Sequence, residues 1–216
     1  MIGDTINIQE QHRDKAAIIL PKIMKKYKRL SVIALGGESG TGKTEVAYVL
    51  QQRLYEEYNI RVKLIHIDDY YFTYWNERND IRKKKGIDSV GQNEIDWKKI
   101  KNIITSFKKR KQYNKVQRIH RWTDQIEQVT IDNSKIDLFI VEGLYALYLK
   151  EFADFKVYLS GTSKDTEEFR VERGKEKQTT FRKKILQKEG MVVRASKKDA
   201  NLKIAFKVKE TYVTKP

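Results

Sequence analysis

Hydrophobic positions along this chain form two kinds of pattern, short apolar runs and longer stretches with helical spacing. The short runs are rich in β-branched residues, as expected for strands buried on both faces of a sheet. They lie at 31–35, 61–67, 137–141, 155–159 and 200–208. Apolar residues three or four positions apart predict helices, which lie at 9–28, 45–57, 96–107, 163–174 and 179–189. Strands alternating with helices predict an α/β fold whose mostly parallel sheet carries helices on both faces.

Three segments modify this alternation. Pro21 falls inside the first helical pattern and predicts a break there, because proline lacks the amide hydrogen that a helix interior needs. The segments 116–121 and 125–131 predict a hairpin or a pair of edge strands. Residues 70–92 are polar, aromatic and basic with little periodicity, which indicates a loop or a small insertion beside a substrate site. No repeat or linker interrupts the chain, so residues 1–216 are expected to form a single domain.

The composition narrows the class of protein. The chain has no cysteine, which excludes disulfides and thiolate metal sites. No apolar run approaches the roughly 20 residues of a membrane span, and the first residues lack a signal-peptide pattern, so we expect a cytoplasmic protein without a membrane partner. The net charge of +16 attracts polyanions. The basic residues are nevertheless spread along the chain without an arginine–aromatic cluster, so nucleic acid is not the expected partner. The oligomeric state stays open, a homo-oligomer included.

The strand at 31–35 leads into a complete phosphate-binding motif, G-x-x-x-x-G-K-[ST]. Its residues are Gly37, Glu38, Ser39, Gly40, Thr41, Gly42, Lys43 and Thr44. In such a loop the backbone N–H groups turn toward phosphate oxygens, and the helix that follows directs its positive end at them. Lys43 is expected to reach the β- and γ-phosphates of ATP, and the Thr44 hydroxyl to bind Mg²⁺. The motif and its strand–loop–helix context predict a P-loop NTPase fold.

A phosphate loop occurs in kinases, in GTPases and in motor ATPases, so the motif alone does not choose among them. Asp88–Gly91 has the D-x-x-G form of a GTPase, but it does not follow an apolar strand. Ser196–Asp199 weakly matches a guanine-reading loop, but it lacks the leading asparagine. The net charge leaves a further alternative, a non-kinase P-loop ATPase that nucleic acid stimulates.

Acidic residues follow two of the predicted strands. Asp68 and Asp69 come directly after the second strand, and Glu142 follows the third. The carboxyl ends of parallel strands meet at the edge of the sheet where ligands bind. A carboxylate at this edge is placed to take the proton of an attacking hydroxyl, as the base of a kinase does. We expect Glu142 or Asp69 to help Thr44 hold Mg²⁺.

The order of these motifs resembles the uridine kinase and phosphoribulokinase family of P-loop kinases. The similarity runs from about residue 33 to residue 204. Besides the phosphate loop, it rests on Asp-Asp-Tyr-Tyr at 68–71, Ile-Asp-Trp at 95–97, Val-Glu-Gly at 141–143, an arginine pair in a lid region at about 163–190, and the closing segment 196–204. The resemblance implies an ATP-dependent kinase that transfers the γ-phosphoryl group to a hydroxyl of a small molecule.

The resemblance also implies roles for individual residues. The first acid of the Asp-Asp motif is the base in the family, which implies Asp68. The aromatic residue that follows touches the acceptor, which implies Tyr71. The lid arginines contact the transferring phosphates, which implies Arg170 and Arg173. Together with Lys43, these residues make up the catalytic and acceptor-binding set that the family suggests.

The resemblance is lost where the uridine kinases of the family read uridine. Their His-Pro-Asp-Ala segment is replaced by Gly-Gln-Asn-Glu at 91–94, and their Pro-x-Tyr-Asp motif by Arg-Ile-His-Arg at 118–121. Arginine suits the bidentate binding of carboxylate or phosphate. We therefore expect Arg118, His120 and Arg121 to contact an anionic or strongly polar acceptor, and uridine and cytidine to be poor substrates. The alternative is that these charges belong to a uniformly basic surface.

Overall fold

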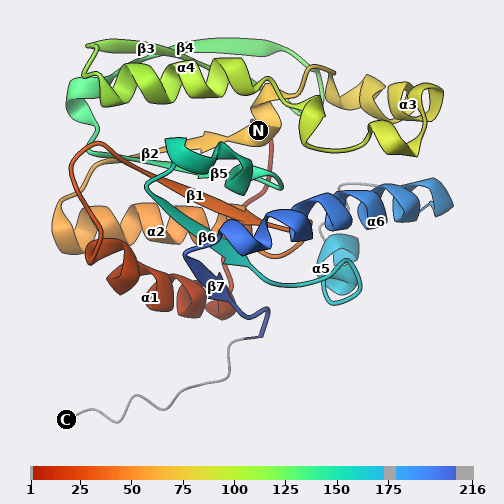
Figure 1. The fold of residues 1–216 in the computed structure, drawn as a ribbon, viewed down its shortest axis with the longest axis horizontal. Coiled ribbons are helices and arrows are strands. Elements are labelled where there is room, and N and C mark those ends of the chain that lie inside the picture. The colour runs from red at the N-terminus through yellow and green to blue at the C-terminus, as the bar shows by residue number, and fades with distance from the viewer. Residues whose placement is uncertain (1, 173–178, 208–216) are drawn as a thin grey trace.

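Five parallel strands form the centre of the structure, a computed structural model that describes residues 2–172 and 179–207 (Figure 1). The strands are β1 (Ser31–Gly37), β2 (Val62–His66), β5 (Leu138–Glu142), β6 (Phe155–Leu159) and β7 (Leu202–Ile204). They lie in the order β2-β5-β1-β6-β7, and every neighbouring pair is parallel. The predicted parallel sheet is confirmed, although the last strand is shorter than predicted and residue 208 lies outside the described residues.

Helices surround this sheet. The described α-helices are α1 (Glu10–Met24), α2 (Lys43–Tyr58), α3 (Trp75–Lys85), α4 (Trp97–Lys108), α5 (Glu167–Glu172) and α6 (Thr180–Ala195). Short 3₁₀ segments lie at Ile67–Tyr70, Ile87–Ser89, Gln92–Glu94, Asn133–Lys135, Ala146–Phe152 and Ser196–Asp199. In the described part of the chain, no helix has both the length and the apolar character needed to cross a membrane.

The two faces of the sheet are covered by different helices, because successive side chains of a strand point to opposite faces. In β1, Ile33 and Leu35 belong to the cluster that α1 and α2 complete. Val32 and Ala34 belong to the cluster on the other face, which α4 completes. Figure 1 shows α1 and α2 on one side of the sheet and α4 on the other. The sheet is therefore buried on both faces, as its continuous apolar strands predicted.

The sequence predicted a break at Pro21, but helix α1 continues through this residue. The helix continues to Met24, and the Lys25 N–H donates to the Pro21 carbonyl at 3.2 Å. Proline removes one amide donor, but within the last turn of a helix this costs only a single backbone hydrogen bond. The buried side chains Ile19, Leu20 and Ile23 hold this turn against α2.

The predicted hairpin is confirmed. Strands β3 (Tyr113–Ile119) and β4 (Ile126–Asp132) pair antiparallel and lie along α4. The Asp124 carboxylate, in the turn between the strands, accepts from the N–H groups of Trp75 and Asn76 at 3.0 and 3.2 Å. The hairpin turn thereby caps the first turn of α3, because those N–H groups have no partner within the helix.

Residues 70–92 do not form only a loop, because α3 occupies the middle of this segment. Its buried side chains are Arg78 and Arg82, which are 6% and 3% exposed. Their spacing of four residues is typical of a helix, but both buried residues are arginines. A search for apolar periodicity therefore misses this helix.

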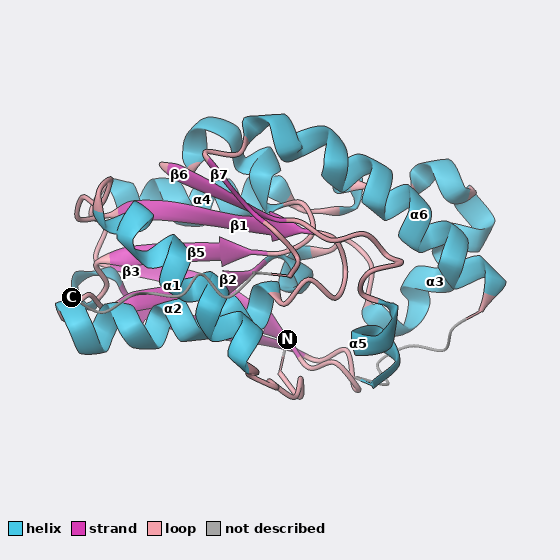
Figure 2. Cartoon of the chain, turned by 90° about the horizontal axis from the view of Figure 1, so that it is seen from below, coloured by secondary structure: helices cyan, strands magenta, loops and turns pink. Residues whose placement is uncertain are grey.

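The carboxyl ends of the strands point toward the end of the molecule where α3, α5 and α6 gather (Figure 2). The phosphate loop lies at this edge.

Asp137 fixes the edge of the sheet where β2 and β5 begin. Its Oδ2 accepts from the Arg61 backbone N–H at 3.1 Å and from Arg61 Nε at 2.8 Å, and its Oδ1 accepts from Arg61 Nη2 at 3.0 Å. The hydrogen bonds from Arg61 hold the pKa of the Asp137 carboxyl below its ordinary value.

Asp137→Asn is expected to lower the free energy of unfolding at pH 7 by about 1 kcal/mol. Because the pKa is lower in the folded state, the contribution of the ionised carboxylate is complete above the unfolded pKa of about 4. It disappears as the pH falls through the lower, folded pKa. Urea unfolding at pH 7 and at pH 3 checks this. An equal difference between wild type and variant at both pH values contradicts it.

Candidate active site

The phosphate loop joins β1 to α2, and two of its glycines are required by their geometry. Gly40 and Gly42 have φ angles of 83° and 84°, a region that favours glycine. A Cβ at Gly42 would lie 2.6 Å from the His12 ring, and a Cβ at Gly40 would lie 2.8 Å from Thr166 Cβ. Side chains from α1 and from the segment before α5 thus pack against the loop backbone, and only glycine fits.

Lys43 and Glu38 tie the loop together. The Lys43 ammonium donates to the Glu38 carbonyl at 2.8 Å, and the Thr41 hydroxyl donates to the same oxygen at 2.9 Å. The buried Glu38 carboxylate accepts from Arg194 of α6 at 2.6 Å. Of the predicted nucleotide-binding residues, Glu38 therefore offers its backbone, while its side chain anchors the loop to α6.

A buried polar group lies beside the loop at the end of β5. The Thr44 hydroxyl donates to Glu142 Oε1 at 3.1 Å, and His66 Nδ1 lies 2.7 Å from the same oxygen. Burial by itself raises the pKa of Glu142. The hydrogen bond with the His66 ring and the charge of Lys43 outweigh it, and they hold the pKa below its ordinary value. Glu142 is therefore a carboxylate near neutral pH, next to the hydroxyl predicted to bind a metal ion.

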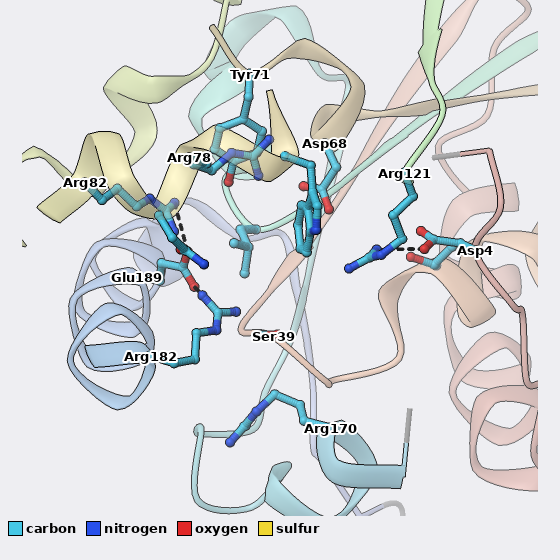
Figure 3. A pocket seen from close by; sticks show the side chains of 14 residues that line it. Asp4, Ser39, Asp68, Tyr71, Arg78, Arg82, Arg121, Arg170, Arg182 and Glu189 are labelled. Atoms are coloured by element: carbon cyan, nitrogen blue, oxygen red, sulfur yellow. Dashed lines mark hydrogen bonds and ion pairs between the residues drawn. The ribbon is translucent and has the colours of Figure 1, made fainter. Parts of the chain in front are cut away.

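The two acids after β2 point in different directions. Asp68 lines a pocket in front of the phosphate loop (Figure 3). Asp69 is 2% exposed, and its Oδ1 accepts from the Ile119 N–H at 3.0 Å. Its carbonyl accepts from the Gln117 side chain, and burial raises the pKa of its carboxyl group. Asp69 thus docks β3 onto the end of the sheet, and Asp68 is the acid that faces the pocket.

The pocket brings together segments that are far apart in the sequence. Its lining side chains come from the N-terminal segment, the phosphate loop, α3, the hairpin, α5 and α6 (Figure 3). It contains the five arginines Arg78, Arg82, Arg121, Arg170 and Arg182 and the three carboxylates Asp4, Asp68 and Glu189. The excess of arginine gives the pocket a positive potential suited to anionic groups.

Arg82 and Arg182 form ion pairs with glutamate side chains of α6 and of the segment after α3. Arg82 donates to both carboxylate oxygens of Glu94, at 2.7 and 2.8 Å, and lies 3.1 Å from Glu189. Arg182 lies 3.5 Å from the other oxygen of Glu189. Glu189 therefore links α3 to α6 across the pocket wall.

Arg78 and Arg121 are different, because aromatic rings hold them. The Arg78 guanidinium lies 3.5 Å from the centre of the Tyr71 ring, and the Arg121 guanidinium lies 4.0 Å from that of Trp75. Arg121 also donates to Asp4 at 2.7 Å. Among the described residues, neither Nε atom has a hydrogen-bond partner, although both are buried. The stacking on aromatic rings and, for Arg121, the ion pair with Asp4 hold these two guanidinium groups in the pocket wall.

The residues predicted to contact the acceptor do not all lie together. Tyr71 and Arg121 line the pocket, whereas Arg118 and His120 are not in its lining, as far as the described residues show. The Arg118 side chain is half-exposed and lies 4.0 Å from Glu127 on β4. Side chains two apart in a strand share a face, so alternation within the predicted strand 116–121 separates Arg118 and His120 from Arg121. This parity was available in the sequence. In the structure β3 ends at Ile119, and Arg121 lies in the turn that follows.

The two predicted lid arginines have different outcomes. Arg170 lines the pocket, and its Nη1 donates to the Ser163 carbonyl at 2.7 Å and to the Thr166 hydroxyl at 2.5 Å. Arg173 lies outside the described residues.

The candidate site residues did not include eight of the residues that line the pocket: Asp4, Trp75, Arg78, Asn79, Arg82, Leu144, Arg182 and Glu189. Arg78 and Arg82 had a signal in their helical spacing, whereas Asp4 had none, because it reaches the pocket from a distant segment.

Comparisons with known proteins identify the family of this chain. A family model described as the phosphoribulokinase / uridine kinase family matches residues 32–205. Uridine kinase from Ureaplasma parvum serovar 3 is 27% identical over 186 residues, which cover 81% of this chain and 87% of that protein.

Solved structures show the same fold. A protein from Silicibacter sp. TM1040, assigned as a fructose transport system kinase, superposes with a TM-score of 0.67 at 15% identity, over 88% of this chain and 98% of its own. Phosphoribulokinase from Rhodobacter spheroides gives a TM-score of 0.60 at 10% identity, over 84% of this chain and 70% of its own.

The family match covers the phosphate loop, the Asp-Asp motif and the lid region together. It supports phosphoryl transfer over the GTPase and the nucleic-acid-stimulated ATPase, which the loop alone left open. This chain belongs to the phosphoribulokinase / uridine kinase family and is an ATP-dependent phosphotransferase.

Proposed function

We propose that this enzyme transfers the γ-phosphoryl group of ATP to a hydroxyl group of a small anionic or strongly polar molecule. The observation that carries the proposal is that Asp68, the phosphate loop and the buried Arg78 and Arg121 all face one pocket. This arrangement supports the proposal, because an acid, a phosphate-binding motif and two guanidinium groups border the same volume.

The nucleotide side follows from the loop. The N–H groups of 37–44 and the N-terminus of α2 would hold the phosphates. Lys43 would exchange its present partner, the Glu38 carbonyl, for phosphate oxygens. Arg170 would balance the negative charge that develops during transfer. Arg173 keeps the same proposed role from the family resemblance alone.

The residues beside the loop fit Mg²⁺. This ion is bound in proteins by one or two oxygen ligands together with water and the phosphates of a substrate. Thr44 and Glu142 supply a hydroxyl and an ionised carboxylate whose oxygens are 3.1 Å apart. When bound, Mg²⁺ would neutralise charge on the phosphates. Asp69, also predicted as a ligand, is instead directed at the hairpin backbone.

Asp68 would act as the general base. Its carboxylate accepts the proton of the acceptor hydroxyl while that oxygen forms a bond to the γ-phosphorus. The bond from the γ-phosphorus to the bridging oxygen breaks, and ADP leaves. Positioning and electrostatic stabilisation supply most of the acceleration in such reactions.

Two matched pairs of acceptors test the proposed charge. Coupled assays of ADP release would compare D-ribulose 5-phosphate with D-ribulose and D-glycerate with glycerol, with uridine and cytidine beside them. At least one anionic member is expected to exceed its neutral partner in kcat/KM. Uridine should stay below about 10⁴ M⁻¹s⁻¹, a modest value for an enzyme. Efficient turnover of uridine would refute an anionic acceptor while leaving the kinase activity in place.

Variants of three arginines provide a second test. Arg78→Ala and Arg121→Ala are each expected to raise KM for the anionic acceptor by about 10- to 100-fold, because a charged hydrogen bond is lost. KM for ATP should change little. Arg118→Ala removes an arginine of the same hairpin that does not line the pocket, so it serves as the matched control. An equal response to all three would mean that only the general surface charge matters.

A further inference from the structure

Helix α1 lies outside the segment that the family model matches, which begins at residue 32. It packs against α2 beneath the phosphate loop. Its buried face carries a lysine among the apolar side chains. Lys15 is 1% exposed, which is unusual because removing an ammonium group from water costs several kcal/mol.

The contacts of Lys15 are directed at the loop. Its Nζ donates to the Thr41 carbonyl at 3.3 Å and lies 5.0 Å from the centre of the Phe206 ring. Burial lowers the pKa of Lys15 to about 8, and the charge of Glu45 opposes this shift. The side chain is therefore mainly protonated at pH 7. One turn earlier, the His12 ring packs against Gly42, so the same face of α1 touches two consecutive residues of the loop.

The orientation of the Thr41 carbonyl has a consequence for the next N–H group. In a trans peptide unit the C=O and the N–H point in opposite directions. Holding the Thr41 oxygen toward α1 therefore directs the Gly42 N–H away from α1, to the opposite side of the loop. That is the side from which a phosphate would approach the N-terminus of α2.

We propose that Lys15 is a positioning residue for nucleotide binding, which fixes the Thr41–Gly42 peptide unit so that the loop is formed before ATP arrives. The buried ammonium also adds positive charge behind the loop, where the surrounding protein screens it less than surface water would. The inference rests on the proposed role of the phosphate loop and concerns a residue that this loop motif does not include.

Lys15→Met tests this role, because methionine keeps an unbranched chain and removes the ammonium. Calorimetric titration of Mg²⁺–ATP into the enzyme is expected to show a Kd at least about tenfold higher than that of the wild type. KM for the acceptor should stay within twofold. Lys22→Met, which removes an exposed lysine of the same helix, is the matched control and should change the Kd by less than twofold.

Thermal unfolding separates positioning from a purely structural role. Replacing a buried charge by an apolar side chain is often neutral or stabilising, so the Tm of Lys15→Met should not fall appreciably. A lower Tm with an unchanged Kd would overturn the inference. Should Lys15→Met fail to fold, Lys15→Leu removes both the N–H donor and the charge with another helix-forming side chain. It is expected to raise the Kd, and a Kd equal to that of the wild type would overturn the inference.

Lys43→Ala distinguishes this inference from the proposed function. Loss of ATP binding in Lys43→Ala with normal binding in Lys15→Met overturns only the role of Lys15. Normal binding and turnover in Lys43→Ala would overturn the role of the phosphate loop and, with it, the inference.

Discussion

Replacing Lys43 by alanine is expected to reduce phosphoryl transfer by about 10³-fold or more, because the transferring phosphate loses its principal cation in the loop. The Lys43 ammonium donates to the Glu38 carbonyl of its own loop at 2.8 Å. Because this contact lies within the loop, the rest of the fold should be retained in the variant. Single-turnover kinetics with saturating acceptor would measure the loss.

Two measurements make this result interpretable. Circular dichroism and a melting curve should match those of the wild type within a few degrees. A variant with near-normal turnover and a normal melting curve would contradict the use of the phosphate loop for ATP. A variant that melts early would instead indicate that Lys43 also supports the loop structurally.

Asp68→Asn is expected to lower kcat by about 10²- to 10⁴-fold, the range found when a general base is removed. The amide has nearly the shape of the carboxylate but accepts protons poorly. KM for ATP should change little, because Asp68 is proposed to contact the acceptor hydroxyl and not the nucleotide. Steady-state kinetics with each substrate varied in turn would check both statements.

Asp69→Asn is the matched control for Asp68. Its side chain oxygen can still accept from the Ile119 N–H, so the hairpin should remain docked. The loss in kcat should be much smaller than for Asp68→Asn. A larger loss in Asp69→Asn would show that Asp69, and not Asp68, is the general base.

Much of the fold could be predicted from the sequence, because apolar strands and amphipathic helices carry their own periodicity. Helix α3 could not be predicted in this way. The buried side chains of this helix are Arg78 and Arg82. Arg78 stacks on the Tyr71 ring, and Arg82 forms ion pairs with Glu94 and Glu189. A buried arginine is stable only where such partners exist, and partners on other elements are invisible in a single segment.

The residues of the phosphate loop could be predicted from the sequence, and most of the other residues that line the pocket could not. The loop motif is contiguous, so its geometry follows from its residues. The rest of the pocket is assembled from separate elements, and only their packing brings Asp4 next to Arg121. Strand parity alone would have separated Arg118 and His120 from Arg121.

The segment before residue 32 changes what counts as the working unit of this enzyme. Lys15 contacts the phosphate loop, and Asp4 lines the pocket in front of it, but neither residue lies within the family match. A chimera joined at residue 32 would therefore keep the phosphate-loop and Asp-Asp motifs and lose both charges. A segment exchange that is meant to keep these two contacts has to include the residues before residue 32.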